Sequence, residues 1–212
     1  MNFLKSSGYF LALIFLITTA NAQESALDKK VEHFLEKQKR QWRDMNVPAS
    51  DGKLLFDIIV KNGYTKGLEI GTSTGHSTVW IAWAFSKTGG KLITIEMDKT
   101  RYEEAVSNLE EAGLSQYVDF RLANAHELVK ELAGPFDFVF SDADKGWYTE
   151  YFKEVSPKLK AGGCFTAHNI RPPGRRGMAG TAEFLEYVMS QENFDTTVDS
   201  SGGGLSISYK KH

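Results

Sequence analysis

Cysteine is almost absent from this sequence. The 212 residues include one cysteine, Cys164, so no disulfide can form within the chain. No cysteine and histidine spacing resembles a structural zinc site. An excess of positive charge is absent too, because the formal net charge is −2 with acidic and basic residues intermixed. The sequence therefore gives no sign of nucleic-acid binding and favours a small-molecule partner.

Long hydrophobic runs are also lacking, and the short one near the N-terminus is typical of an export signal. Lys5 precedes an apolar run over residues 9–17, and Ala20 and Ala22 supply small residues for cleavage. A membrane anchor is the alternative, but the run falls short of the roughly 20 residues needed to span a bilayer. We expect a signal peptide over residues 1–22 and an exported protein, periplasmic or secreted, without membrane contact after cleavage.

The remaining residues, 23–212, have a length and hydrophobic content (42% for the whole chain) that favour a single domain. An amphipathic helix is expected over residues 26–43, and a second over about 49–62, capped by Ala49-Ser50-Asp51. Strands then alternate with helices. We expect strands at 67–70, 91–96, 118–122, 136–141 and 163–167, and helices at 77–85, 99–112, 125–132 and 147–158.

This alternation predicts an α/β fold with a doubly wound, mostly parallel sheet and helices on both faces. Two further strands, 194–199 and 205–209, flank a Ser- and Gly-rich turn and predict a closing antiparallel hairpin, which brings the sheet to seven strands. In such folds ligands bind at the carboxyl ends of the strands.

A glycine-containing turn follows the first strand of the predicted sheet. It runs from Glu69 to Ser77, with Gly71 and Gly75 four positions apart. Small residues let a ligand approach the backbone, and the N–H groups that begin a helix suit a carboxylate or phosphate. The spacing differs from the G-x-G-x-x-G of dinucleotide-binding proteins, so a dehydrogenase is disfavoured. A tight turn without a ligand is the alternative.

Glu96 ends the second predicted strand, about 20 residues further along the chain than the glycine turn. An acidic side chain at this place can accept hydrogen bonds from the hydroxyl groups of a ribose. The alternative is that Glu96 caps the helix that begins near Asp98.

Charged side chains follow the fourth and fifth strands. Asp142, Asp144 and Lys145 lie on the loop after the fourth strand, and His168 and Asn169 end the fifth. Neighbouring strand ends would bring Asp142 close to His168 and Asn169, a set of donors suited to a metal ion. The alternatives are a helix start stabilised by aspartate, a solvated Lys145 and a hydrogen-bonded structural histidine.

Taken in order, these motifs resemble those of the catechol and caffeoyl-coenzyme-A O-methyltransferases, a cation-dependent branch of the class I methyltransferases. The similarity runs from about Trp42 to the end, and its motifs are Met45-Asn46-Val47, Glu69 to Ser77, Ile95-Glu96, Asp142 to Lys145 and His168-Asn169-Ile170. It implies an S-adenosylmethionine-dependent O-methyltransferase.

The resemblance also implies roles for single residues. Met45 and Val47 would border the cofactor, Gly71 and Ser77 would hold its methionyl part, and Glu96 would bind its ribose. Adenine would lie near Ala125 and His126, and the remaining cofactor positions would be Glu69, Ser73, Met97 and Asp142. Lys145 stands where the family has its general base.

The metal ligands implied by the resemblance are Asp142, His168 and Asn169. The family has aspartate where this sequence has His168, and exchanging a carboxylate for imidazole shifts preference from Mg²⁺ towards Mn²⁺, Fe²⁺ or Zn²⁺. In the implied mechanism the cation binds adjacent oxygens of a small, catechol-like acceptor, and Lys145 takes a hydroxyl proton.

Several alternatives stay open. A nucleotide-dependent oxidoreductase and a non-catalytic S-adenosylmethionine-binding protein remain as rival functions, and the sequence leaves a homodimer open. The basic loop over residues 171–177 is either a recognition element for an acidic acceptor or solvated. Trp147 and Tyr148 line the acceptor site or pack in the core.

Overall fold

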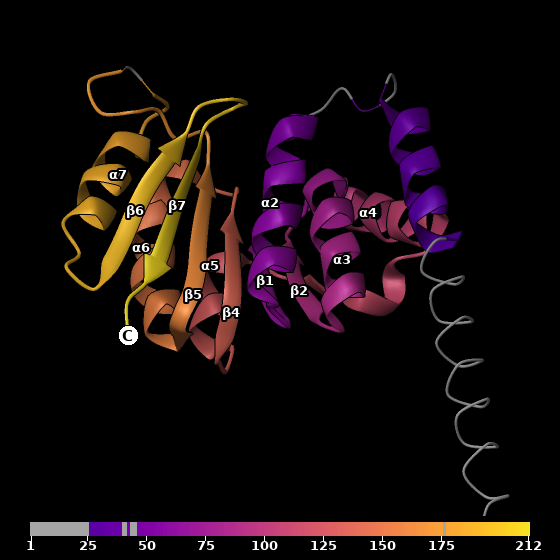
Figure 1. Cartoon of the computed structure of the whole chain (residues 1–212), viewed down its shortest axis with the longest axis horizontal. Helices are drawn as coiled ribbons and strands as arrows, with labels where there is room; N and C mark the ends of the chain where they lie inside the picture. Colours follow the sequence, from indigo (N-terminus) through magenta and orange to yellow (C-terminus); the bar gives the residue numbers. More distant parts are fainter. Residues whose placement is uncertain (1–25, 40–41, 43–45, 176) are drawn as a thin grey trace, which may run out of the picture. The chain divides into compact units, whose positions relative to one another are not determined.

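The computed structural model describes residues 26–39, 42, 46–175 and 177–212 (Figure 1). The expected signal peptide and Met45 lie outside the described residues. Contacts divide the chain into two compact units, residues 1–41 and 42–212. In the first unit, residues 26–38 form a helix. In the described part of the chain, no helix is both long enough and apolar enough to cross a membrane.

The second unit is built on a seven-stranded sheet, with the spatial order β3-β2-β1-β4-β5-β7-β6. The first five strands in the sequence pair in parallel: β1 (Lys66–Ile70), β2 (Lys91–Glu96), β3 (Val118–Leu122), β4 (Phe136–Ser141) and β5 (Leu159–His168). The last two, β6 (Phe194–Asp199) and β7 (Leu205–Lys210), form a hairpin in which β7 runs antiparallel to β5. The predicted fold class is confirmed.

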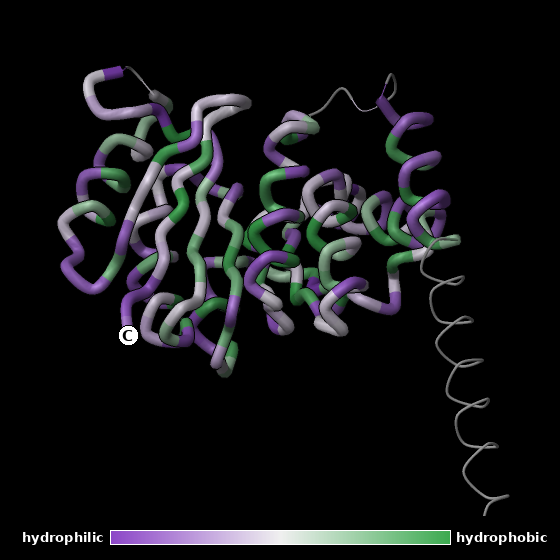
Figure 2. The backbone as a smooth tube through the Cα atoms, in the orientation of Figure 1, coloured by the Kyte–Doolittle hydropathy of each residue, from purple (hydrophilic) through white to green (hydrophobic). Residues whose placement is uncertain are grey.

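Helices cover the sheet in two groups. The first group, whose members contact one another in series, is α2 (Ala49–Asn62), α3 (His76–Thr88) and α4 (Lys99–Ala112). The second is α5 (Ala125–Glu131), α6 (Tyr148–Val155) and α7 (Thr181–Met189). Phe138 and Phe140 of β4 pack with α2 and α3, whereas Val139 packs with the second group. Neighbouring strand residues point to opposite faces, so both faces of this largely hydrophobic strand are covered (Figure 2).

Some elements differ from the sequence-based expectations. Helix α2 begins at Ala49 after Pro48 and has no side-chain cap, so the capping expected of Ala49-Ser50-Asp51 is wrong. Helix α6 ends at Val155, where a 3₁₀ turn containing Pro157 replaces the expected α-helix. Helix α7 was not expected from the sequence. Its N-cap is Gly180, which offers no capping side chain as a signal.

The order of strands reverses between β1 and β4. Strand β1 is followed along the chain by β2 on one side, whereas β4 and β5 continue the sheet on the other side. In doubly wound folds, the crevice at the carboxyl ends of the strands next to this reversal is where ligands bind. The fold therefore places the loops after β1 and β4 at the expected binding edge.

Candidate active site

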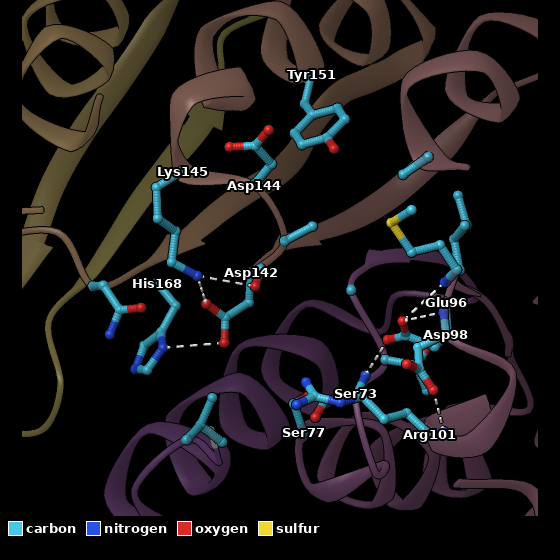
Figure 3. Close-up of a pocket in the computed structure, with 18 of the residues that line it drawn as sticks. Ser73, Ser77, Glu96, Asp98, Arg101, Asp142, Asp144, Lys145, Tyr151 and His168 are labelled. Atoms are coloured by element: carbon cyan, nitrogen blue, oxygen red, sulfur yellow. Dashed lines mark hydrogen bonds and ion pairs between the residues drawn. The ribbon is translucent and has the colours of Figure 1, made fainter. Parts of the chain in front are cut away.

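A cavity of about 1020 Å³ opens at this edge of the sheet. Its walls come largely from the carboxyl edge of the sheet, from the ends of β2 and β5 and from the segments that follow β1, β2, β3, β4 and β5 (Figure 3). Most of the predicted site residues line it, namely Val47, Gly71, Ser73, Ser77, Glu96, Met97, Ala125, His126, Asp142, Lys145, His168 and Asn169. Residues predicted from separate motifs thus meet in one cavity.

The glycine turn is held close to the loop that follows β4. Gly71 has a φ of 100°, and a Cβ atom there would lie 2.9 Å from the backbone nitrogen of Ala143. The backbone N–H groups of Gly71 and Thr72 both donate to the carbonyl of Ile95, at 3.1 Å. Only glycine combines this left-handed conformation with so close an approach. The turn therefore joins the ends of three strands.

Glu69 is placed differently from the other predicted cofactor residues, because it does not line the cavity. Its carboxylate is fully buried and accepts hydrogen bonds from the hydroxyls of Ser77 (2.6 Å), Thr78 (2.7 Å) and Thr94 (2.6 Å). Burial raises the pKa of Glu69 to about 7, although these hydrogen bonds act in the opposite direction. The prediction of a direct cofactor contact is not supported by this placement, which makes Glu69 a residue that positions Ser77.

Glu96 is fixed by backbone donors. Its Oε2 accepts from the N–H of Ser73 at 2.7 Å, and its Oε1 accepts from those of Met97 (2.8 Å) and Asp98 (2.9 Å). Asp98, and not Glu96, caps helix α4, since its side chain accepts from the N–H of Arg101. Each carboxylate oxygen can accept more than one hydrogen bond, so the anchored Glu96 keeps acceptor capacity for a ligand.

Unsatisfied polar atoms belong to the wall next to the glycine turn. Among the described residues, Asn46 Nδ2, Ser73 Oγ and His76 Nδ1 are buried without a hydrogen-bond partner, and all three residues line the cavity. Burial lowers the pKa of His76 to about 4, so the ring is neutral at pH 7. Buried polar groups in native proteins are nearly always paired. A polar ligand can complete this wall.

Aromatic rings form another part of the wall, at the predicted adenine position. The ring of His126 stacks on Trp147 with centroids 3.7 Å apart and an interplanar angle of 10°. His126 Nε2 also lies 3.5 Å from a carboxylate oxygen of Asp144. Tyr148, by contrast, is fully buried and donates hydrogen bonds to the carbonyl of His168 (3.2 Å) and to Asp142 (3.4 Å). Tyr148 is therefore a core residue beneath the site.

Lys145 and Asp142 form an ion pair at the end of β4. The Lys145 ammonium donates to Asp142 Oδ1, and to the backbone carbonyl of Asp142 at 2.9 Å. The side chains are 20% and 13% exposed, so the pair faces the cavity but is largely shielded from water. Figure 3 shows Lys145 and His168 both directed at Asp142. The 3₁₀ turn Lys145–Trp147 holds this lysine beside the strand end, and a fully solvated Lys145 is excluded.

His168 lies between two carboxylates. Its Nδ1 is 3.2 Å from Asp142 Oδ2, and its Nε2 is 2.9 Å from Oδ2 of Asp51, on helix α2. Burial alone lowers the pKa of His168, but the hydrogen bonds and charges of Asp142 and Asp51 outweigh burial and raise the pKa to about 9. Sequence reasoning missed Asp51, because its partner lies 117 positions away.

The expected metal ligands are close together but are not arranged as a ligand set. Both ring nitrogens of His168 and both carboxylate oxygens of Asp142 already have partners of opposite charge. Asn169 lines the cavity with a φ of 59°. Among the described residues, no group of three or more histidine, cysteine or acidic side chains is placed to hold a metal ion. The residues present therefore do not fit a divalent cation in this arrangement.

No described residue of the basic loop, residues 171–177, lines the cavity, although Met178 directly after it does. Arg171 and Arg175 are exposed and do not line it, Arg176 lies outside the described residues, and Met178 lines it.

Comparison with known sequences gives one consistent result. The sequence pattern of the O-methyltransferase family matches residues 18–179. A catechol O-methyltransferase of Niastella koreensis is 42% identical over 136 residues, 62% of this chain and 61% of the relative. Caffeoyl-CoA O-methyltransferase 1 of Zea mays is 30% identical over 162 residues, 74% of this chain and 62% of the relative. The chain thus spans less than two thirds of the length of these relatives.

Solved structures give the same fold. An O-methyltransferase of Streptomyces achromogenes involved in tomaymycin synthesis, in complex with S-adenosylmethionine, has a TM-score of 0.71 and 27% identity, covering 88% of this chain and 90% of that one. An O-methyltransferase of Bacillus cereus in complex with S-adenosylhomocysteine has a TM-score of 0.73 and 24% identity, covering 86% and 91%.

Proposed function

Because the chain belongs to the O-methyltransferase family, we propose that it transfers a methyl group from S-adenosylmethionine to a hydroxyl of a small acceptor. The observation that carries the proposal is the cavity at the reversal of strand order, where an anchored Glu96 and the Asp142–Lys145 pair line the same space. The named relatives favour an acceptor with adjacent oxygens, as in catechol.

The wall next to the glycine turn fits the methyl donor. Glu96 would accept hydrogen bonds from its ribose hydroxyls, and Ser73, Ser77 and Asn46 would face its polar methionyl end. The partnerless atoms of Asn46, Ser73 and His76 support this assignment, since a ligand that carries donors and acceptors can satisfy them. S-adenosylmethionine supplies a methyl group made electrophilic by a positively charged sulfur.

The chain's own part in the reaction is to align the acceptor and to take a proton. Lys145 can act as a base only as a neutral amine, yet here it donates to Asp142, so the two form one coupled acid–base unit. When their shared proton lies on Asp142, the neutral Lys145 amine takes the proton of the acceptor hydroxyl. The acceptor oxygen bonds the methyl carbon as the carbon–sulfur bond breaks and its electron pair stays on sulfur, and the positive charges of Lys145 and His168 stabilise the oxyanion.

The expected divalent cation has no part in this mechanism. The side chains that would hold it are engaged with one another, as the two carboxylate contacts of His168 show. Proton transfer and alignment of the acceptor therefore depend on residues of the chain alone.

The test is calorimetric titration with S-adenosylmethionine, combined with detection of methylated product from 1,2-dihydroxybenzene and its 1,4-isomer. We expect micromolar binding and transfer to the 1,2-isomer. Lys145→Met should lower kcat by about 10²- to 10⁴-fold, the usual contribution of a positioned acid or base, with unchanged donor affinity. Binding without transfer to any acceptor would leave a binding protein, and binding of reduced nicotinamide in place of S-adenosylmethionine would indicate an oxidoreductase.

A further inference from the structure

The His168–Asp51 contact joins three parts of the fold that are distant in sequence. Asp51 lies in the first turn of α2, His168 ends β5, and Gly203 lies in the β6–β7 loop. The N–H of Gly203 donates to Asp51 Oδ2 at 2.8 Å, and the same oxygen lies 2.9 Å from His168 Nε2. The Asp51 side chain is 1% exposed and that of His168 is 5% exposed. Both side chains of this contact are therefore buried from solvent.

The loop that covers this contact has no room for side chains. A Cβ atom on Gly203 would lie 2.5 Å from His168 Nε2, and a Cβ on Gly202 would collide with Asp51 Oδ1. Side chains at these positions would push Asp51 or His168 away. The two glycines thus allow the loop to close over a buried ion pair.

A histidine ring with a carboxylate at each nitrogen carries protons on both nitrogens, because each ring nitrogen must donate to satisfy its acceptor. Such a ring has no free lone pair with which to bind a metal. Neither oxygen of Asp142 is free for a metal ion, since one pairs with His168 and the other with Lys145. The four side chains form a cluster of two negative and two positive charges, and a divalent cation would have to displace a positive group that is already in place.

We propose that His168, clamped by Asp51, replaces the divalent cation of related enzymes, so that methyl transfer by this chain needs no metal. Asp51 is then a positioning residue: it touches neither donor nor acceptor and acts by holding the imidazolium against Asp142. For the reaction itself this inference rests on the proposed function, but its consequences for metal binding and for the state of His168 can be measured without catalysis.

The first experiment measures cation binding to the purified chain after dialysis against a chelator. We expect no stoichiometric metal and no saturable calorimetric signal with Mn²⁺, Zn²⁺ or Mg²⁺. His168→Asp removes a positive charge, adds a negative one and places three carboxylates together, so this variant should bind Mn²⁺ at least tenfold more tightly than the wild type. If the variant is unstable, a rise in its Tm on adding Mn²⁺, absent in the wild type, gives the same answer.

A second histidine provides the matched control. His126 also lines the cavity beside a carboxylate, that of Asp144, but among the described residues this is its one carboxylate contact, and Asp144 is half exposed. If the wild type binds a cation weakly, and this binding is lost in His126→Asn but kept in Asp142→Asn, the cation lies at His126 and not at His168, as the proposal expects. One cation bound by the wild type and lost in Asp142→Asn would overturn it.

The second experiment observes the His168 ring by ¹⁵N NMR. Both ring nitrogens should carry protons at pH 7 in the wild type, whereas Asp51→Asn should allow Nε2 to lose its proton and should lower kcat with little change in KM or donor affinity. A ring nitrogen without a proton in the wild type would overturn the proposal. Chelator should leave the wild-type rate within twofold, and complete loss with chelator would also overturn it. If no methyl transfer is found at all, the proposed function fails while the metal and NMR results still decide the state of His168.

Discussion

Replacing Glu96 by glutamine should weaken the binding of S-adenosylmethionine in a way that can be worked out from its contacts. Three backbone N–H groups, those of Ser73, Met97 and Asp98, hold the carboxylate at 2.7–2.9 Å and leave acceptor capacity for the ribose. A glutamine that keeps its oxygen towards Met97 and Asp98 turns its NH₂ group towards the N–H of Ser73, where two donors meet. The ribose then loses its charged acceptor.

The size of the effect follows from hydrogen bonds to charged groups. Each contributes roughly 1.5–3 kcal/mol, and loss of one corresponds to about a 10- to 150-fold rise in Kd. The unpaired N–H of Ser73 should also lower the free energy of unfolding by about 1–3 kcal/mol. Both effects arise without any change in the shape of the side chain.

The assay is calorimetric titration of wild type and Glu96→Gln with S-adenosylmethionine, with circular dichroism to confirm folding. The control is Glu103→Gln on α4, because Glu103 is 63% exposed, lies 3.6 Å from the exposed Lys99 and does not line the cavity. A folded Glu96→Gln chain that binds within threefold of the wild type would refute the assignment of Glu96 to the ribose.

Three further predictions concern other parts of the chain. Gly203→Ala should destabilise the fold by about 1–3 kcal/mol, because its Cβ would lie 2.5 Å from His168 Nε2; denaturant unfolding would measure this, and an unchanged midpoint would contradict it. The pKa of His76 is about 4 in the folded chain, against 6.5 in the unfolded chain, so the neutral ring contributes fully to stability above pH 6.5. As the pH falls towards 4, the free energy of unfolding should decrease by roughly 3 kcal/mol through this group. The variant His76→Asn should show a flatter dependence of stability on pH in this range, and a dependence identical to that of the wild type would argue against a buried neutral ring. Export should leave a mature N-terminus at Gln23, which mass spectrometry of protein from its native host can check, an intact Met1 being the contrary result.

Local patterns in the sequence were sufficient for much of the fold and of the cavity wall. The alternation of strands and helices predicts the parallel sheet, and the carboxyl ends of parallel strands share one edge. The sequence alone therefore predicts that Gly71, Glu96 and Lys145 lie together, as they do in the cavity. Such reasoning works where a residue's place is set by the strand that it follows.

The second partner of His168, Asp51, could not be predicted in this way, although its contact with Asp142 was. Asp51 has the local features of a helix start, and only the packing of α2 against β5 and the β6–β7 loop turns its carboxylate towards the imidazole. Glu69 shows the same limit, since its position in the glycine motif suggested a ligand contact while its burial beneath Ser77 gives it three hydroxyl partners. Burial and long-range pairing decide these roles, and neither is visible in local spacing.

The glycine loop between β6 and β7 has a consequence for the order in which the protein matures. Asp51 leaves the ribosome about 150 residues before Gly203, which donates to it in the folded chain. Translation at about 5–20 residues per second puts roughly 8–30 s between the two. During that time the glycine turn, Glu96 and the Asp142–Lys145 pair can all be present on a nascent chain whose Asp51 still lacks its cover. The His168–Asp51 contact is thus among the last parts of the cavity region to be completed, and a chain halted before the hairpin would have the glycine turn and Glu96 without the loop that covers Asp51.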